Sequence, residues 1–116
     1  MTSTNDLNKQ IVDLGNYRGG FLWRNNTGAL KVGGRFVRFG FVGSGDVIGV
    51  YHGHFVSIET KTGRDVASNK QIEFAEQVNR LGGFACFARD IDEAIEFFDH
   101  IDKTIAERNG AQVIPF

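Results

Sequence analysis

Residues 45–61 read GDVIGVYHGHFVSIETK, and this stretch decides the fold. An acid opens the first apolar run, a turn at 52–54 follows, and Ile-Glu-Thr-Lys ends the second run, which predicts a β-hairpin. Side chains alternate between the faces of a strand, so Glu59 and Lys61 project to one face, about 7 Å apart. The hairpin returns Asp46 to their side, and two carboxylates and one ammonium are therefore expected to converge.

These residue types predict metal-assisted cleavage of a phosphodiester bond. Two neighbouring carboxylates, Asp46 and Glu59, suit a hard divalent cation such as Mg²⁺ or Mn²⁺. Such a cation polarises a phosphate and lowers the pKa of bound water. The Lys61 ammonium can orient or deprotonate a water molecule, or neutralise a phosphate. The alternative is a solvated strand end, because Glu-x-Lys pairs are common on exposed strand faces.

The bulk composition describes one globular domain spanning residues 1–116. The chain is 41% hydrophobic and 23% charged, which is typical of a folded protein rather than a disordered one. The longest apolar runs are too short to span a membrane, and the N-terminus lacks the regions of a signal peptide. A single cysteine, Cys86, cannot form an intramolecular disulfide, and its apolar neighbours predict a core position. We expect a cytoplasmic protein without a membrane segment.

The charges are unevenly distributed. Residues 1–45 carry six basic and two acidic residues, whereas residues 46–116 carry seven basic and twelve acidic residues. A basic half beside an acidic half can present a face for the phosphates of DNA. The candidate DNA contacts are Arg24, Lys31, Arg35 and Arg38. The alternatives are ordinary surface charge and an edge strand protected by charges.

Local patterns predict the remaining elements. Leu7, Ile11 and Leu14 recur at helical spacing and Gly15 follows as a stop. Residues 21–24 form a short strand, and 35–41, which do not alternate cleanly, are expected at a sheet edge or in a long loop. Residues 84–88 form another strand. The order predicts an α/β or α+β domain, with a mixed central sheet flanked by helices.

Two further helices are expected in the second half. Ser68 and Gln71 have the spacing of a capping box, so a helix begins there and ends at Gly82-Gly83. Asp90 caps a last helix, which we expect to stop at Asn109-Gly110. The predicted apolar stripe of the first of these helices comprises Ile72, Ala75, Val78 and Leu81. That of the last helix comprises Ile91, Ala94, Ile95, Phe98, Ile101 and Ile105.

Taken together, these motifs resemble the VRR-NUC domain of the PD-(D/E)XK nuclease superfamily. The resemblance covers roughly residues 5–95 and rests on the order and spacing of its motifs. They are Arg24-Asn25-Asn26-Thr27-Gly28, Gly45-Asp46, Ile58-Glu59-Thr60-Lys61-Thr62-Gly63, Ser68-Asn69-Lys70-Gln71 and Leu81-Gly82-Gly83-Phe84-Ala85. It implies a restriction-endonuclease-like αβββαβ core.

The resemblance also implies roles for single residues. Asp46 and Glu59 match the metal-binding acids, with the backbone carbonyl of Thr60 as a further ligand, and Lys61 matches the catalytic lysine. Gln71 matches the glutamine on the helix that packs against the active-site strands, which implies a catalytic role, and a helix cap is an alternative or additional role for it. Family members commonly carry a glutamate on the first helix. This chain has no glutamate before Glu59, so Asp6 is the nearest substitute ligand, and the number of bound metals stays open.

The implied activity is a Mg²⁺- or Mn²⁺-dependent DNA endonuclease selective for branched DNA, such as four-way junctions. Stand-alone members of this family, often encoded by phages, suggest the cytoplasm of a bacterial or phage-infected cell. A junction has two-fold symmetry, so a homodimer would present two sites suitably. The alternatives are a sequence-specific restriction-type nuclease, a non-catalytic DNA-binding or interaction module on the same fold, and a structural protein with a chance Glu-x-Lys pair.

Overall fold

A computed structural model describes residues 2–26 and 28–113; for 28–30, 37–39 and 110–113 it describes the backbone alone. Thr27 lies outside the described residues. The helices are α1 (Thr4–Tyr17), α2 (Asn69–Arg80) and α3 (Ile91–Val113). The strands are β1 (Phe21–Arg24), β2 (Gly28–Val32), β3 (Arg35–Phe39), β4 (Val47–Tyr51), β5 (His54–Thr60) and β6 (Phe84–Ala88).

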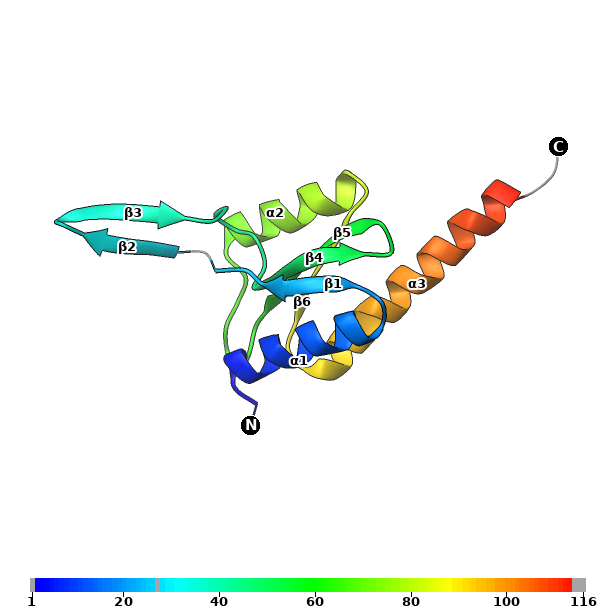
Figure 1. Ribbon diagram of the computed structural model, residues 1–116, viewed down its shortest axis with the longest axis horizontal. Coiled ribbons are helices and arrows are strands. Elements are labelled where there is room, and N and C mark those ends of the chain that lie inside the picture. Colours follow the sequence, from blue (N-terminus) through cyan, green and yellow to red (C-terminus); the bar gives the residue numbers. More distant parts are fainter. Residues whose placement is uncertain (1, 27, 114–116) are drawn as a thin grey trace.

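In the described part of the chain, four strands form a mixed sheet in the order β1-β4-β5-β6 (Figure 1). The strands β1, β4 and β5 are antiparallel neighbours, while β6 runs parallel to β5 after the α2 crossover. Apart from a β2–β3 insertion and the final α3, the chain therefore follows the order αβββαβ. The expected α+β fold with a mixed sheet between helices is confirmed.

The core lies between the sheet and the helices α1 and α3. Leu7 and Ile11 of α1 pack in one buried cluster with Val56 and Ile58 of β5 and with Phe98 of α3. The predicted stripe of α3 supplies this cluster, and its Ala94, Phe98 and Ile101 are fully buried. The other sheet face carries α2, which has no buried residue among its described positions. This second face is therefore only partly covered.

The β4–β5 hairpin forms as its sequence predicts. Its register pairs Tyr51 with His54, which leaves His52 and Gly53 as a two-residue turn. Both turn residues have positive φ, 49° for His52 and 84° for Gly53, as a type I′ turn requires. This turn sets the register that brings Val47 opposite Ile58 and carries Asp46 to the end of β5.

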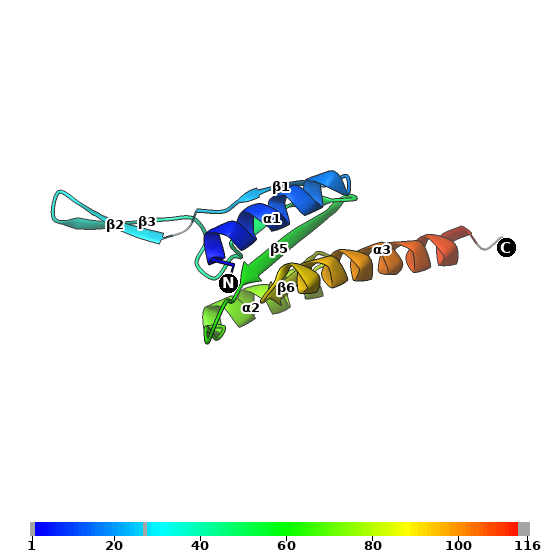
Figure 2. The same ribbon diagram turned by 90° about the horizontal axis from the view of Figure 1, so that it is seen from below.

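Residues 35–39 form a strand, as expected, but this strand does not lie at the edge of the main sheet. Arg35–Phe39 forms β3, which pairs with β2 in a separate two-stranded ribbon instead of joining the main sheet. Figures 1 and 2 show this ribbon extending clear of the helices and of the sheet. The molecule accordingly measures 64 Å along its longest axis and 31 Å along the next.

The predicted helix ends and one apolar stripe need correction. The helix α1 continues past Gly15 to Tyr17, and α3 continues through Asn109-Gly110 to Val113. The α2 stripe does not enter a core, since Ile72 and Leu81 are exposed. The capping box at Ser68 and Gln71 is confirmed by both of its hydrogen bonds. Among the described residues, no helix combines the length and apolar character needed to cross a membrane.

Candidate active site

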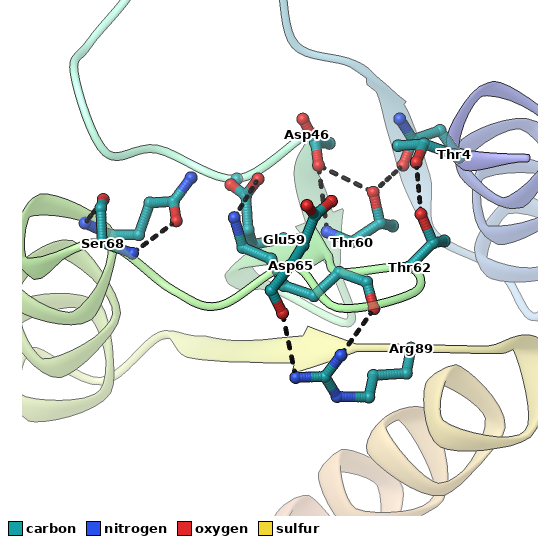
Figure 3. A network of polar contacts seen from close by, with 12 residues as sticks. Thr4, Asp46, Glu59, Thr60, Thr62, Asp65, Ser68 and Arg89 are labelled. Carbon is teal, nitrogen blue, oxygen red and sulfur yellow. Dashed lines mark hydrogen bonds and ion pairs between the residues drawn. The ribbon is translucent and has the colours of Figure 1, made fainter.

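The three predicted charged residues meet at one end of the sheet. Asp46 directly precedes β4, and Glu59 and Thr60 end β5, the antiparallel neighbour of β4 (Figure 3). The Asp46 Oδ2 atom accepts hydrogen bonds from the Thr60 backbone N–H at 3.0 Å and from the Thr60 hydroxyl at 2.8 Å. The carboxylate of Asp46 is therefore fixed at the end of β5.

Gly45 allows this close approach of the two strands. A Cβ atom at position 45 would lie 2.5 Å from the Ser57 Oγ atom and 2.8 Å from the Ile58 carbonyl oxygen. The Gly45 backbone N–H also donates to the Ser57 hydroxyl at 3.0 Å. A larger residue would push the chain away from β5, so the glycine before Asp46 has a direct steric reason.

Glu59 is buried beside Asp46. Glu59 is only 8% exposed. Burial and the neighbouring carboxyl group of Asp46 raise the pKa of Glu59 from 4.5 to about 8, while Lys61 opposes the rise. Two carboxyls this close cannot both ionise cheaply in a poorly hydrated place. The metal-free pair therefore retains a proton near neutral pH.

Lys61 completes the charged cluster. Its Nζ atom lies 3.9 Å from the Glu59 Oε1 atom, and its side chain is 13% exposed. Its backbone N–H donates to the Ala88 carbonyl of β6 at 3.0 Å, which holds the residue just beyond the end of β5. The ammonium is thus placed beside the carboxyl pair with limited access to solvent.

Arg89, which the sequence patterns did not single out, fastens the loop after Lys61. Its guanidinium donates to the carbonyls of Lys61 at 3.3 Å, Gly63 at 3.4 Å and Asp65 at 3.1 Å (Figure 3). Three carbonyls converge on one planar cation, which pins the loop backbone against the end of β6. Arg89 follows β6 directly, but nothing in its local sequence indicates this tertiary contact.

The first helix brings Asn8 to the site. Asn8 is buried, and its side chain lies 2.8 Å from the Thr60 hydroxyl, which also contacts Asp46. Asp6 is exposed, and two residues of helix rotate it by about 200° from Asn8. The structure therefore does not bring Asp6 to the carboxyl pair. A polar residue within the Leu7 and Ile11 stripe was the available signal for Asn8.

Gln71 sits in the first turn of α2. Its side-chain carbonyl accepts from the Ser68 backbone N–H at 3.0 Å, and its own backbone N–H donates to the Ser68 hydroxyl at 3.2 Å. The side-chain oxygen of Gln71 is therefore occupied by the helix cap. Its amide nitrogen remains the group that can serve the active site.

The predicted DNA contacts occupy different places. Arg24 ends β1 and donates to the Asn5 side chain at 2.9 Å. Lys31 and Arg35 are exposed on the β2–β3 ribbon. Arg38 belongs to β3 by its backbone, and its side chain lies outside the described part.

Cys86 is half-buried against the core, and burial raises the pKa of its thiol to about 12, in keeping with a structural role.

The donor atoms at the carboxyl pair fit a hard cation. Within residues 2–26 and 28–113, no cluster of three or more acidic, His or Cys side chains could hold a metal ion. Asp46 and Glu59 offer two neighbouring carboxyl groups. A strand residue points its N–H and C=O to the same edge, so the Thr60 carbonyl faces the side of Asp46. Mg²⁺ accepts such a sparse oxygen set and keeps several waters.

Comparison with known proteins gives no assignment: no protein-family model matches the chain, and no curated protein is similar to it.

Proposed function

We propose that this protein is a metal-dependent endonuclease that hydrolyses phosphodiester bonds in DNA. The observation that carries the proposal is the Glu59 carboxyl, which is buried beside the half-buried Asp46 with the Lys61 ammonium 3.9 Å away. A buried pair of acids costs stability unless a cation or proton relieves it. A divalent cation would do so while turning the pair into a phosphate-binding site.

The chain's own residues define a division of roles. Asp46 and Glu59, with the Thr60 carbonyl, would hold the cation, which supplies charge relief for the phosphate and acidifies bound water. Thr60 fixes the orientation of Asp46 through two hydrogen bonds. Lys61 would hold the attacking water or a phosphate oxygen in line for displacement. Gln71 would contribute its free amide nitrogen.

The order of elements supports membership of the VRR-NUC group within the PD-(D/E)XK superfamily. The αβββαβ order places Gly45-Asp46 before the second strand of the main sheet and Glu59-Thr60-Lys61 at the end of the third. Asn8 stands on the first helix where the resemblance leads one to expect an acid. We infer that one cation bound by two carboxylates is the working site, in a cytoplasmic protein.

The test is cleavage of labelled DNA with Mg²⁺ or Mn²⁺. Four-way junction, flap, single-stranded and linear duplex substrates would be compared for the wild type, Lys61→Ala and the exposed control Lys70→Ala. We expect preferential cutting of the junction, a loss of at least about a hundredfold in Lys61→Ala, and little change in Lys70→Ala. Metal-dependent thermal stabilisation should persist in Lys61→Ala. If none of the four substrates is cut in the presence of Mg²⁺ or Mn²⁺, the proposal is contradicted and a non-catalytic DNA-binding module is favoured.

We further propose that two copies pair through the partly covered face of the sheet. Phe21, Val50 and Phe55 lie side by side on three adjacent strands, and all three are exposed. Phe55 also lines an open groove with Leu81 of the α2 end, which is exposed as well. Contiguous exposed apolar patches of this kind mark interaction sites. A two-fold dimer would match the symmetry of a four-way junction.

Sedimentation tests the pairing. The wild type is expected to have the mass of a dimer at micromolar concentration, and Leu81→Glu to shift it towards the monomer. Val66→Glu changes an equally exposed apolar residue in the loop before α2 and is the matched control. A monomeric wild type would refute the dimer while leaving the nuclease proposal to the cleavage assay.

A further inference from the structure

The β2–β3 ribbon is the most prominent feature that the site chemistry leaves unexplained. A lone two-stranded hairpin has marginal stability in water, because it has no second layer against which to bury side chains. In this ribbon Val32 is 57% exposed and Phe36 is 77% exposed. Neither strand pairs with the main sheet. A ribbon of this form is expected to acquire its packing partner on binding.

Its charge indicates the nature of that partner. The sequence has no acidic residue from position 14 to position 45, and Lys31 and Arg35 flank the ribbon's turn. Directly opposed residues of two strands share a face, so one face carries Lys31 with Phe36 and the other carries Arg35 with Val32. Among the ribbon residues whose side chains the structure describes, each face thus combines a cation with an apolar side chain. This combination suits phosphates beside the sugars and base edges of a nucleic acid.

Its dimensions fit a groove of duplex DNA. The two-residue turn at Gly33-Gly34 has φ of 57° and 80°, which makes a narrow tip. Five residues per strand reach about 17 Å, and the strands lie about 4.8 Å apart. The major groove of B-DNA is about 12 Å wide and admits a two-stranded ribbon.

The ribbon is also joined firmly to the candidate active site. Asn25, in its outgoing arm, donates from its backbone to the Asp46 carbonyl at 2.8 Å. The Asn25 side chain donates to the Ser44 hydroxyl at 2.7 Å and to the Gly45 carbonyl at 2.9 Å, in the returning arm. Both arms are thus tied together at the residue that opens β4. The base of the ribbon therefore lies beside Asp46.

We infer that the β2–β3 ribbon is a DNA-binding arm that enters the major groove of a duplex beside the scissile phosphate, through Lys31, Arg35 and Phe36. This inference rests on the proposed nuclease function for its substrate. It adds the element that binds the duplex, and it assigns DNA binding and DNA cleavage to different parts of the molecule. The ribbon contributes binding energy and register, while Asp46, Glu59 and Lys61 perform the chemistry.

Binding without cleavage tests the arm. Fluorescence anisotropy of a labelled 25-base-pair duplex in EDTA would be measured across a salt series for the wild type, Arg35→Glu, Lys31→Glu and Lys103→Glu. Lys103 is exposed on α3, so its reversal changes net charge equally at a remote position. We expect each ribbon reversal to weaken binding about tenfold and to reduce the salt slope by about one, with less than a twofold change in Lys103→Glu. Phe36→Ser should weaken binding without changing the salt slope.

The possible outcomes distinguish the proposal of a DNA-binding arm from the proposal of a nuclease. Equal affinities and slopes for Arg35→Glu and Lys103→Glu would overturn the arm, even if the wild type cuts DNA with Mg²⁺. Ribbon-dependent binding without any metal-dependent cutting would support the arm and contradict the nuclease. A wild type that binds no duplex would overturn the arm. If Arg35→Glu instead lowers the sedimentation mass and leaves DNA affinity unchanged, the ribbon joins two copies of the chain and the arm is refuted.

Discussion

Replacing Glu59 by glutamine should remove a specific pH dependence of stability. In the metal-free protein the Glu59 carboxyl has a pKa of about 8, against an ordinary value of 4.5. Between these values the folded protein holds a proton that the unfolded chain has released. Stability therefore falls as pH rises through this window and is recovered at lower pH. Glutamine cannot ionise, and its amide can still donate to Asp46.

The size of the effect follows from the two pKa values. Each pH unit inside the window costs up to about 1.4 kcal/mol, and integration between pH 5 and pH 7 gives a loss of roughly 2.5 kcal/mol. Solvent access is small at Glu59, which is 8% exposed, so screening reduces this figure only modestly. Against a total stability of about 5–15 kcal/mol, such a loss is readily measured.

Urea unfolding in EDTA at pH 5, 6 and 7 measures this loss. The free energy of unfolding of the wild type should fall relative to that of Glu59→Gln, while Glu96→Gln, at an exposed position on α3, should follow the wild type. Saturating Mg²⁺ should abolish the fall in the wild type and leave Glu59→Gln unchanged. If the free energies of unfolding of the wild type and of Glu59→Gln change equally between pH 5 and pH 7 in EDTA, Glu59 does not hold the proton in this range, and the proposal of a protonated carboxyl pair is refuted.

Two further variants test the surroundings of the pair. Asn8→Ala removes the contact between α1 and the Thr60 hydroxyl, which keeps its bond to Asp46, and should cost about 0.5–1.5 kcal/mol in urea unfolding. The exposed Lys9→Ala should change stability little, and equal stabilities of the two variants would show that the Asn8 contact does not stabilise the fold. Arg89→Ala frees the loop carbonyls, and should lower DNA cleavage about tenfold while metal-dependent stabilisation persists, because a loosened Lys61 loses its alignment. If Arg89→Ala cleaves DNA as fast as the wild type, the contacts of Arg89 with the loop carbonyls do not align Lys61.

The hairpin and the meeting of Asp46, Glu59 and Lys61 were predictable because both depend on local rules. A two-residue turn fixes the register, and the two-residue period of a strand fixes the face of each side chain. The capping box at Ser68 is equally local, since both of its hydrogen bonds join residues three apart. Sequence spacing alone carries this information, so these features followed without knowledge of tertiary packing.

The contacts of Asn8 and Arg89 join distant segments, so no local pattern indicates them. The Gly33-Gly34 turn between β2 and β3 is a local hairpin signal, but nothing local decides whether that hairpin joins the main sheet or stands apart from it. The apolar spacing of α2 predicted a buried stripe, but α2 covers only part of the sheet, and Leu81 stays exposed. Periodicity indicates which face of a helix is apolar, and the neighbouring elements decide how much of it is buried.

Two neighbouring carboxyl groups destabilise the metal-free protein, and this unfavourable free energy explains the close contacts that Lys61 and Thr60 make with them. Lys61 lowers the pKa of Glu59, yet this influence is smaller than burial and the two effects of Asp46, so one ammonium 3.9 Å away does not neutralise the pair. Thr60 holds Asp46 in place through two hydrogen bonds. Burial is the largest cause that raises the pKa of Glu59, so the proton is expected on Glu59. We therefore expect a cation to bind by displacing one proton from Glu59, so that its affinity rises about tenfold per pH unit below the pKa of that carboxyl.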